Sequence, residues 1–144
     1  MKQVAKILIG SRAFFEGLEG FTPKDSDWLY IMDSFGPLRV TRLRMKLDGN
    51  DCILIPRKRK EDYLQDTIND DLGLQLGKFF VPEFAEYIGL TINDLKHFEK
   101  YLNRLDGKHL YYEIIYDSYI ENNSFTLTDE QRLKAFEEYK KYRN

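Results

Sequence analysis

The sequence predicts an α+β protein, with strands and short helices in its first half and helices alone in its second. Residues 4–9 (VAKILI) are a continuous apolar run with β-branched residues, which indicates a buried strand. Residues 41–48 alternate between charged and uncharged side chains, which indicates a half-exposed strand. After Gly73 the apolar residues recur at helical spacing. We therefore expect an α/β core over residues 1–70 and a helical subdomain over residues 71–144 that packs on it.

Turn-forming residues divide the first part of the chain. Gly10-Ser11 ends the first strand, Gly20 and Pro23 mark a loop, and Asp48-Gly49-Asn50 is a strong hairpin signal. The elements expected between these turns are, in order, a strand at 4–9, a helix at 12–17, strands at 27–33, 41–48 and 52–56, and a helix at 61–69.

Helix signals mark the second part. Pro82 suits the first turn of a helix, where its missing N–H is not needed. Thr91 with Asp94, and Thr128 with Gln131, have the spacing of capping boxes. We expect helices that begin at Pro82, run from about 92 to 105, occupy 108–121, and run from about 129 to 142. Two aromatic groups at helical spacing are predicted to pack in the core: Phe79, Phe80 and Phe84, and Tyr112, Tyr116 and Tyr119.

Charge is uneven along the chain, although the net charge of the whole is −2. Residues 1–60 carry a net charge of +5 and residues 61–144 a net charge of −7. A basic first part is compatible with a phosphate-bearing ligand. The same split could draw two subdomains together, and the sequence leaves both interpretations open.

Cysteine and histidine usage excludes two kinds of site. Cys52 is the only cysteine, so an internal disulfide and a thiolate metal cluster are excluded. His97 and His109 are the only histidines and lie far apart in sequence, which excludes a multi-histidine zinc site. The first apolar run is too short for a signal peptide, and no stretch approaches the roughly 20 apolar residues of a membrane span. We expect a soluble cytoplasmic protein.

One stretch carries a recognisable motif. A strand leads into Gly10-Ser11-Arg12 and a short helix, and after a loop Asp25-Ser26-Asp27 opens the next strand. This order resembles the nucleotidyltransferase superfamily that includes the DNA polymerase beta-like and minimal nucleotidyltransferases. The resemblance is specific over residues 4–33 and architectural beyond them. It implies a short mixed sheet with flanking helices, followed by a C-terminal helical bundle.

The chemistry of the motif suits that family. Gly10 and Ser11 present backbone N–H groups and a hydroxyl to a nucleotide phosphate, and Gly10 has no Cβ to keep the phosphate away. Arg12 is placed to neutralise phosphate charge. Asp25 and Asp27 are two apart on an extended segment, so their carboxylates project to one face and can ligate Mg²⁺. The resemblance implies that these two aspartates are the catalytic and metal-binding pair.

The chain departs from the family pattern at the metal site. Family members carry an aspartate where this chain has Leu29, so the pair shifts to Asp25 and Asp27. The resemblance also implies a third carboxylate on a neighbouring strand, which would complete a two-metal site.

A third carboxylate is not evident in the sequence. The strand at 52–56 contains no acid. Asp48 and Asp51 are expected at the turn, which is the wrong end for a ligand unless the hairpin bends inward. Asp33 is expected on the Asp27 face but about 20 Å farther along the strand.

Several of these features also have purely structural interpretations. The glycine–serine turn is typical of any strand-to-helix connection with a serine N-cap. Asp25 and Asp27 are typical of a loop that closes after Pro23. Trp28 and Tyr30 are candidates for stacking on a base, although aromatic residues in strands usually pack. His109 is a candidate for proton transfer or phosphate binding, with a structural role as the alternative.

Two basic segments are possible nucleic-acid or phosphate contacts. Arg42, Arg44 and Lys46 form the charged face of one strand, and Arg57–Lys60 is a basic run before a helix. A solvated strand face and a helix lead-in explain the same residues equally well.

The resemblance leads to two functional hypotheses. The first is an enzyme that uses Mg²⁺ and a nucleoside triphosphate and transfers a nucleoside monophosphate to a protein, small-molecule or RNA acceptor. The second is a catalytically inactive derivative that binds a nucleotide, RNA or a protein partner. Leu29 and the missing third acid favour the derivative, whereas the intact motif favours the enzyme. A helical interaction module with an accessory sheet requires the motif to be accidental. The composition suits a bacterium or its phage.

Overall fold

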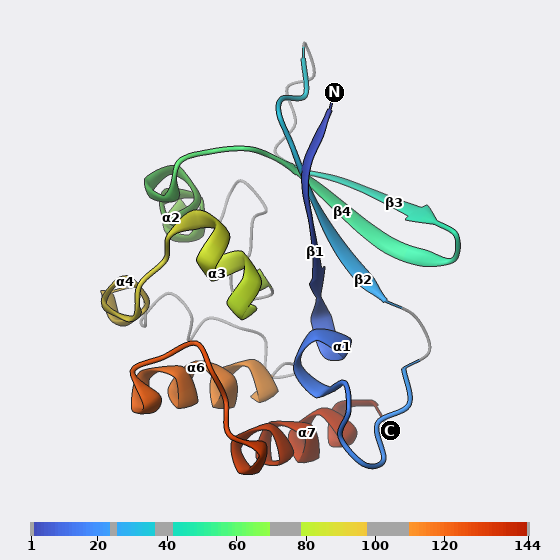
Figure 1. Cartoon of the computed structure of the whole chain (residues 1–144), viewed down its shortest axis with the longest axis vertical. Coiled ribbons are helices and arrows are strands. Elements are labelled where there is room, and N and C mark those ends of the chain that lie inside the picture. The colour runs from blue at the N-terminus through green and yellow to red at the C-terminus, as the bar shows by residue number, and fades with distance from the viewer. Residues whose placement is uncertain (1, 24–25, 37–41, 70–78, 98–109, 144) are drawn as a thin grey trace. The chain divides into compact units, whose positions relative to one another are not determined.

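The computed structural model describes residues 2–23, 26–36, 42–69, 79–97 and 110–143. The chain forms two compact units, residues 1–79 and 80–144, whose elements are labelled in Figure 1. The expected boundary between residues 70 and 71 lies outside the described residues. The α+β class is confirmed: the described residues form a four-stranded mixed sheet and six helices.

The first unit is built on the sheet. Its strands are β1 (Gln3–Ile9), β2 (Asp27–Met32), β3 (Leu43–Leu47) and β4 (Asn50–Pro56). They lie in the order β1-β2-β4-β3, with β1 antiparallel to β2, β2 parallel to β4, and β4 antiparallel to β3. β3 and β4 are joined by a tight turn in which Asp48 and Gly49 have φ of 53° and 82°, the positive values typical of a two-residue hairpin loop.

Two helices belong to the first unit. α1 (Gly10–Phe15) continues directly from β1 and contacts β1 and β2. It starts two residues before the expected helix, and its N-cap position is Ile9. The alternative interpretation of Ser11 as an N-cap is therefore wrong. α2 (Lys60–Asn69) follows β4, close to the expected position.

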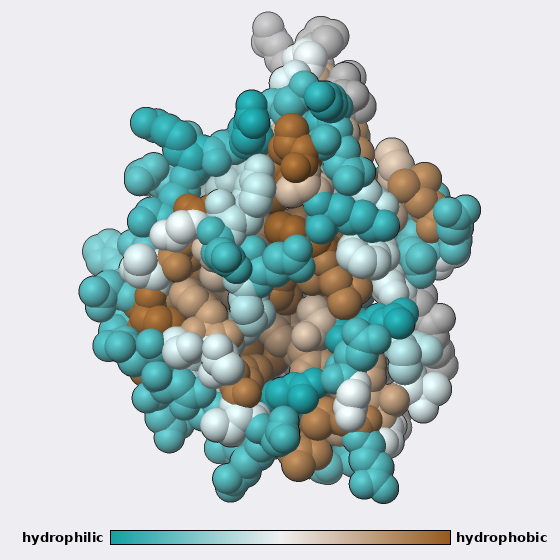
Figure 2. Space-filling view, in the orientation of Figure 1, coloured by the Kyte–Doolittle hydropathy of each residue, from teal (hydrophilic) through white to brown (hydrophobic). Residues whose placement is uncertain are grey.

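The two faces of the sheet are packed differently. On one face Met32, Cys52 and Leu54 form a buried cluster with Phe35. The opposite face buries the apolar residues Ile7, Ile9, Leu29, Ile31 and Ile55. The outer strand β3 is the exception, because Met45 and Leu47 are 41% and 44% exposed. Figure 2 shows a small apolar surface bordered by hydrophilic side chains where the β3–β4 hairpin lies.

The second unit is helical over its described residues. Its helices are α3 (Pro82–Ile88), α4 (Ile92–His97), α6 (Leu110–Asn122) and α7 (Asp129–Arg143), and α6 packs on α7. Pro82 starts α3, as expected, and Gly89 ends it in the left-handed conformation with φ of 74°. None of the helices described in either unit is long and apolar enough to cross a membrane.

Both predicted capping boxes are present. At α4 the Thr91 N–H donates to Asp94 Oδ2 over 2.9 Å, and the Asp94 N–H donates to Thr91 Oγ1 over 3.2 Å. At α7 the Thr128 N–H donates to Gln131 Oε1 over 3.0 Å, and the Gln131 N–H donates to Thr128 Oγ1 over 3.1 Å. These bonds satisfy N–H groups that a helix start leaves without a partner.

The predicted aromatic core of the second unit is confirmed. Phe80, Phe84, Tyr112, Tyr116 and Tyr119 are all buried, and so is Phe79, the last residue of the first unit. The Tyr119 hydroxyl donates to the Phe80 carbonyl over 2.9 Å. The Tyr116 hydroxyl is buried without a hydrogen-bond partner within the described part of the chain.

Candidate functional site

Gly10 and Asp27 meet where β1 ends and β2 begins. Ile9 and Asp27 are paired across the antiparallel strands. Gly10 has φ of 75°, and a Cβ added to it would lie 2.6 Å from Oδ2 of Asp27. The missing side chain of Gly10 therefore makes room for the Asp27 carboxylate. Its expected role toward a phosphate stays a prediction.

Arg12 connects α1 to the segment that precedes β2. Its Nη1 donates to Oγ of Ser26 over 2.7 Å, and its Nε and Nη2 both donate to Oε1 of Glu16 over 3.2 Å. Ser26 is only 6% exposed, and its N–H donates to Oδ1 of Asn50 over 3.0 Å. Side-chain hydrogen bonds thus join α1 to the starts of β2 and β4. Ser11, the second residue of α1, is half-buried.

Asp51 lies beside Asp27, which corrects the expectation that it sits at the wrong end of the sheet. β4 is a direct neighbour of β2 in the sheet, whereas β3 lies at the outer edge, beyond β4. Because β4 runs parallel to β2, both strands begin at the same end of the sheet. Asp27 is paired in register with Asp51. Paired residues of neighbouring strands point to the same face of a sheet. The two carboxylates therefore share a face and an end of the sheet.

Basic side chains continue this arrangement onto β3. Lys46 is the antiparallel partner of Asp51, and both Lys46 and Arg44 are exposed. Arg42, just before β3, is half-buried, and its burial, followed by the charge of Arg44, lowers its pKa. One row of paired residues crosses the four strands on this face: Ile9, Asp27, Asp51 and Lys46.

The carboxylates of Asp27 and Asp51 suit a metal ion at this end of the sheet. Mg²⁺ is usually bound by one or two carboxylates with phosphates and water, a requirement that this pair fits. Asp25, the other predicted ligand, lies outside the described residues. Leu29 is on the Asp27 face but is fully buried, at 0% exposure. Within the described ranges no three or more Asp, Glu, His or Cys residues group closely enough to hold a metal ion.

Asp33 has a structural role at the other end of β2. Its Oδ1 accepts hydrogen bonds from the backbone N–H groups of Lys2, over 2.8 Å, and Ser34, over 2.7 Å. The hydrogen bond from Lys2 is the largest cause of a lowered Asp33 pKa. This carboxylate holds the start of the chain against the end of β2.

Trp28 and Tyr30 point to the face opposite Asp27. They pack against the cluster of Met32, Phe35, Cys52 and Leu54. The Lys6 ammonium lies 4.2 Å from the centroid of the Trp28 ring and 5.7 Å from that of Tyr30. These rings therefore lie on the face of the sheet opposite Asp27, and their packing role is confirmed.

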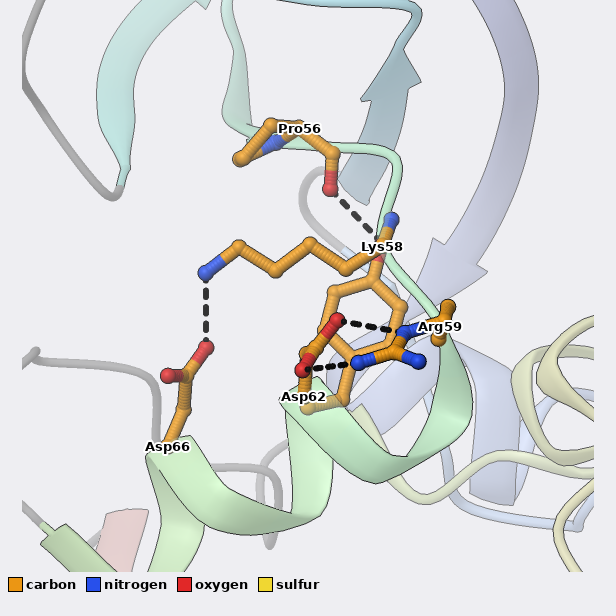
Figure 3. Close-up of polar contacts among 6 residues, drawn as sticks. Pro56, Lys58, Arg59, Asp62 and Asp66 are labelled. Carbon is orange, nitrogen blue, oxygen red and sulfur yellow. Dashed lines mark hydrogen bonds and ion pairs between the residues drawn. The ribbon is translucent and has the colours of Figure 1, made fainter.

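Two residues of the basic run anchor α2 (Figure 3). Lys58 Nζ lies 2.9 Å from Oδ2 of the buried Asp66, and Arg59 pairs with the more exposed Asp62 at 3.2 Å. The Tyr63 hydroxyl donates to the Pro56 carbonyl over 2.7 Å and accepts from the Lys58 N–H over 3.1 Å. The interpretation of these residues as a helix lead-in explains their contacts.

Comparisons with protein-family models, curated proteins and solved structures find no match to this chain. The chain's own geometry adds Ser26, Asn50 and Asp51 to the residues that the sequence suggested. The sequence contained one hint of the role of Asp51. The connection between β2 and β3 is too long for a tight hairpin, so β3 need not be the neighbour of β2, and the strand that begins beside Asp51 can take that place. His109 lies outside the described residues.

Proposed function

We propose that the first unit is a nucleotidyltransferase-like domain that binds a nucleoside triphosphate with Mg²⁺. The convergence of Gly10, Asp27 and Asp51 at one end of the sheet carries this proposal. Asp27 and Asp51 would hold the metal ion, with Asp25 as a further ligand. Ser11 and Arg12 would contact the phosphates, and Lys46, next in the row, would contact the departing pyrophosphate or an acceptor.

The reaction is the transfer of a nucleoside monophosphate. An acceptor hydroxyl forms a bond to the α-phosphorus, the bond from that phosphorus to the pyrophosphate oxygen breaks, and the hydroxyl proton passes to a carboxylate or water. A bound Mg²⁺ would neutralise charge on the phosphates. The chain's own contribution is to place carboxylates beside one another and a guanidinium near them, which orients the reacting groups.

The second candidate is a domain of this kind that binds without catalysis. Leu29 is buried where the family places a metal ligand, and Arg12 is already engaged by Glu16 and Ser26. A domain of this type would bind a nucleotide, RNA or a protein partner without Mg²⁺-dependent chemistry.

A thermal melt with nucleotides distinguishes the two candidates. ATP, GTP, CTP and UTP are each added with and without Mg²⁺ to the wild type, Asp27→Asn, Asp51→Asn and Arg12→Ala. A nucleotide at about 100 times its Kd adds about 2.7 kcal/mol to the free energy of unfolding. Glu86→Ala removes an exposed carboxylate of α3 and serves as the control.

The transferase predicts a Mg²⁺-dependent rise in Tm for at least one nucleotide, lost in both aspartate variants and kept in the control. A rise that needs no Mg²⁺ and disappears only in Arg12→Ala supports binding without catalysis. A melt unchanged by every nucleotide would reject the proposed function.

A further inference from the structure

A hydrogen bond joins the two residues that precede the candidate carboxylates in the sequence. Ser26 precedes Asp27 and Asn50 precedes Asp51, and the Ser26 N–H donates to Asn50 Oδ1 over 3.0 Å. The register of β2 with β4 begins at Asp27 and Asp51. The Ser26–Asn50 bond therefore ties the two strands one residue before their ladder begins.

Strand ends are where a ladder opens most easily. Asn50 is well suited to prevent this, because it is paired with Leu47 in the β3–β4 hairpin and follows a tight turn. The hairpin holds the backbone of Asn50, while its side chain reaches Ser26, just before β2. A bond from so fixed a residue limits how far the starts of β2 and β4 can separate.

Ser26 is held on a second side by Arg12. Arg12 Nη1 donates to Ser26 Oγ over 2.7 Å, and Glu16 orients the same guanidinium from just beyond α1. Ser26 is 6% exposed, and both of its hydrogen bonds are part-buried, which limits competition from water. The pair of bonds at Ser26 fixes the guanidinium of Arg12 relative to the starts of β2 and β4.

We propose that Asn50 is a positioning residue that keeps the Asp27 and Asp51 carboxylates at a separation at which they share one divalent cation. This inference rests on the proposed function and deepens it, because it names the residue that sets the geometry of the cation site. Asn50 would act through its hydrogen bond to the Ser26 N–H.

The experiment compares wild type, Asn50→Ala and Asn50→Asp. An aspartate at position 50 still offers an acceptor to the Ser26 N–H, so it is the rescue variant. Asn93→Ala, an exposed asparagine on α4, is the control. Amide hydrogen exchange at Ser26 reports the bond itself. The concentration of Mn²⁺ alone that broadens the Asp27 and Asp51 amides reports cation affinity at these residues, and nucleotide affinity with and without Mg²⁺ reports the function.

We expect fast Ser26 exchange in Asn50→Ala, with cation affinity and Mg²⁺-dependent nucleotide affinity about tenfold weaker. Protection of the Ser26 amide returns in Asn50→Asp, whose added charge keeps its cation affinity out of the comparison, and Asn93→Ala behaves as wild type. The inference is overturned if Asn50→Ala frees the Ser26 amide while Mn²⁺ still broadens both aspartate amides at the wild-type concentration, since the bond is then only a strand-end contact.

The same measurements separate this inference from the proposed function. Wild type that binds Mn²⁺ at the two aspartates but binds no nucleotide would reject the function and leave the positioning role in place. Wild type in which Mn²⁺ broadens neither amide would reject both.

Discussion

At the scale of single residues, Gly10 shows how a backbone position places a carboxylate. Its φ of 75° and the 2.6 Å that would separate an added Cβ from Asp27 Oδ2 are two separate constraints. The first disfavours any residue with a side chain, and the second disfavours it only because Asp27 is there. Gly17 carries the first constraint without the second, since its φ is 91° and nothing lies within 4 Å of an added Cβ.

Gly10→Ala should therefore cost more stability than Gly17→Ala. The left-handed backbone accounts for about 1–2 kcal/mol in each variant, and the contact with Asp27 adds to this only at position 10. Urea unfolding measures the difference, and Asp27→Gly in the Gly10→Ala background should remove most of that difference. Equal losses in the two alanine variants would mean that the Asp27 carboxylate moves aside without cost.

Two buried tyrosines of α6 form a natural matched pair. The Tyr116 hydroxyl has no partner among the described residues, whereas that of Tyr119 donates to the Phe80 carbonyl over 2.9 Å. Tyr116→Phe should stabilise the protein by about 1 kcal/mol, because it removes an unsatisfied polar group. Tyr119→Phe should destabilise it by about 1–2 kcal/mol, because the carbonyl loses its donor. Chemical denaturation of both variants measures the change in the free energy of unfolding. Two changes of the same sign would contradict the prediction.

At the scale of elements, two ion pairs of unequal burial join α2 to the segment that follows β4. Asp66 is 5% exposed and pairs with Lys58, while Asp62 is more exposed and pairs with Arg59. An exposed pair is screened by water and contributes little, whereas removing one member of a buried pair leaves a charge without its partner.

Asp66→Asn should accordingly lower stability by about 1–3 kcal/mol, reduced from the fully buried case because Lys58 retains some contact with water. Asp62→Asn should leave the Tm almost unchanged. Thermal melts at low and high salt test both: the Asp66 effect should persist in high salt, and a salt-sensitive loss would show that the pair behaves as a surface contact.

At the scale of the whole molecule, the uneven charge of the chain does not follow its two compact units. Residues 1–79 carry 13 basic and 12 acidic residues, a net charge of +1, and residues 80–144 carry a net charge of −3. The basic excess of residues 1–60 is nearly balanced by acidic residues within the same unit. Attraction between oppositely charged subdomains is therefore a weaker explanation of the pattern than the sequence suggested.

Alkaline pH should destabilise the second unit. Burial raises the pKa of Tyr116 and of Tyr119 above the ordinary value of 10.0. The unfolded chain then releases these protons first, so the stabilising contribution is complete below about pH 10 and is lost as pH rises toward the folded values. Each tyrosine should lower the free energy of unfolding by about 1.4 kcal/mol per pH unit above that point.

Denaturant titrations between pH 9 and 11 measure this slope. Tyr116→Phe should make the slope shallower, because one titrating group is gone. The attribution to buried tyrosines fails if the variant and the wild type lose stability in parallel.

Most elements that depend on neighbouring residues could be predicted from the sequence alone. Apolar periodicity predicted the strands and helices, the Asp48-Gly49 pair predicted the hairpin, and the spacing of Thr128 and Gln131 predicted a capping box that is present. These features follow from local preferences, because the interacting groups lie within a few residues of one another. Local patterns also singled out Gly10 and Asp27, although not the contact between them.

The neighbours of each strand, and with them the composition of the candidate site, depend on the tertiary structure. The parallel pairing of β2 with β4 placed Asp51 beside Asp27 and brought Asn50 within reach of Ser26. The packing of the sheet also fixed Trp28 on the face opposite Asp27, since alternate residues of a strand face opposite sides. Strand order is set by how the whole sheet buries its apolar faces, a long-range balance of packing that no short stretch of sequence contains.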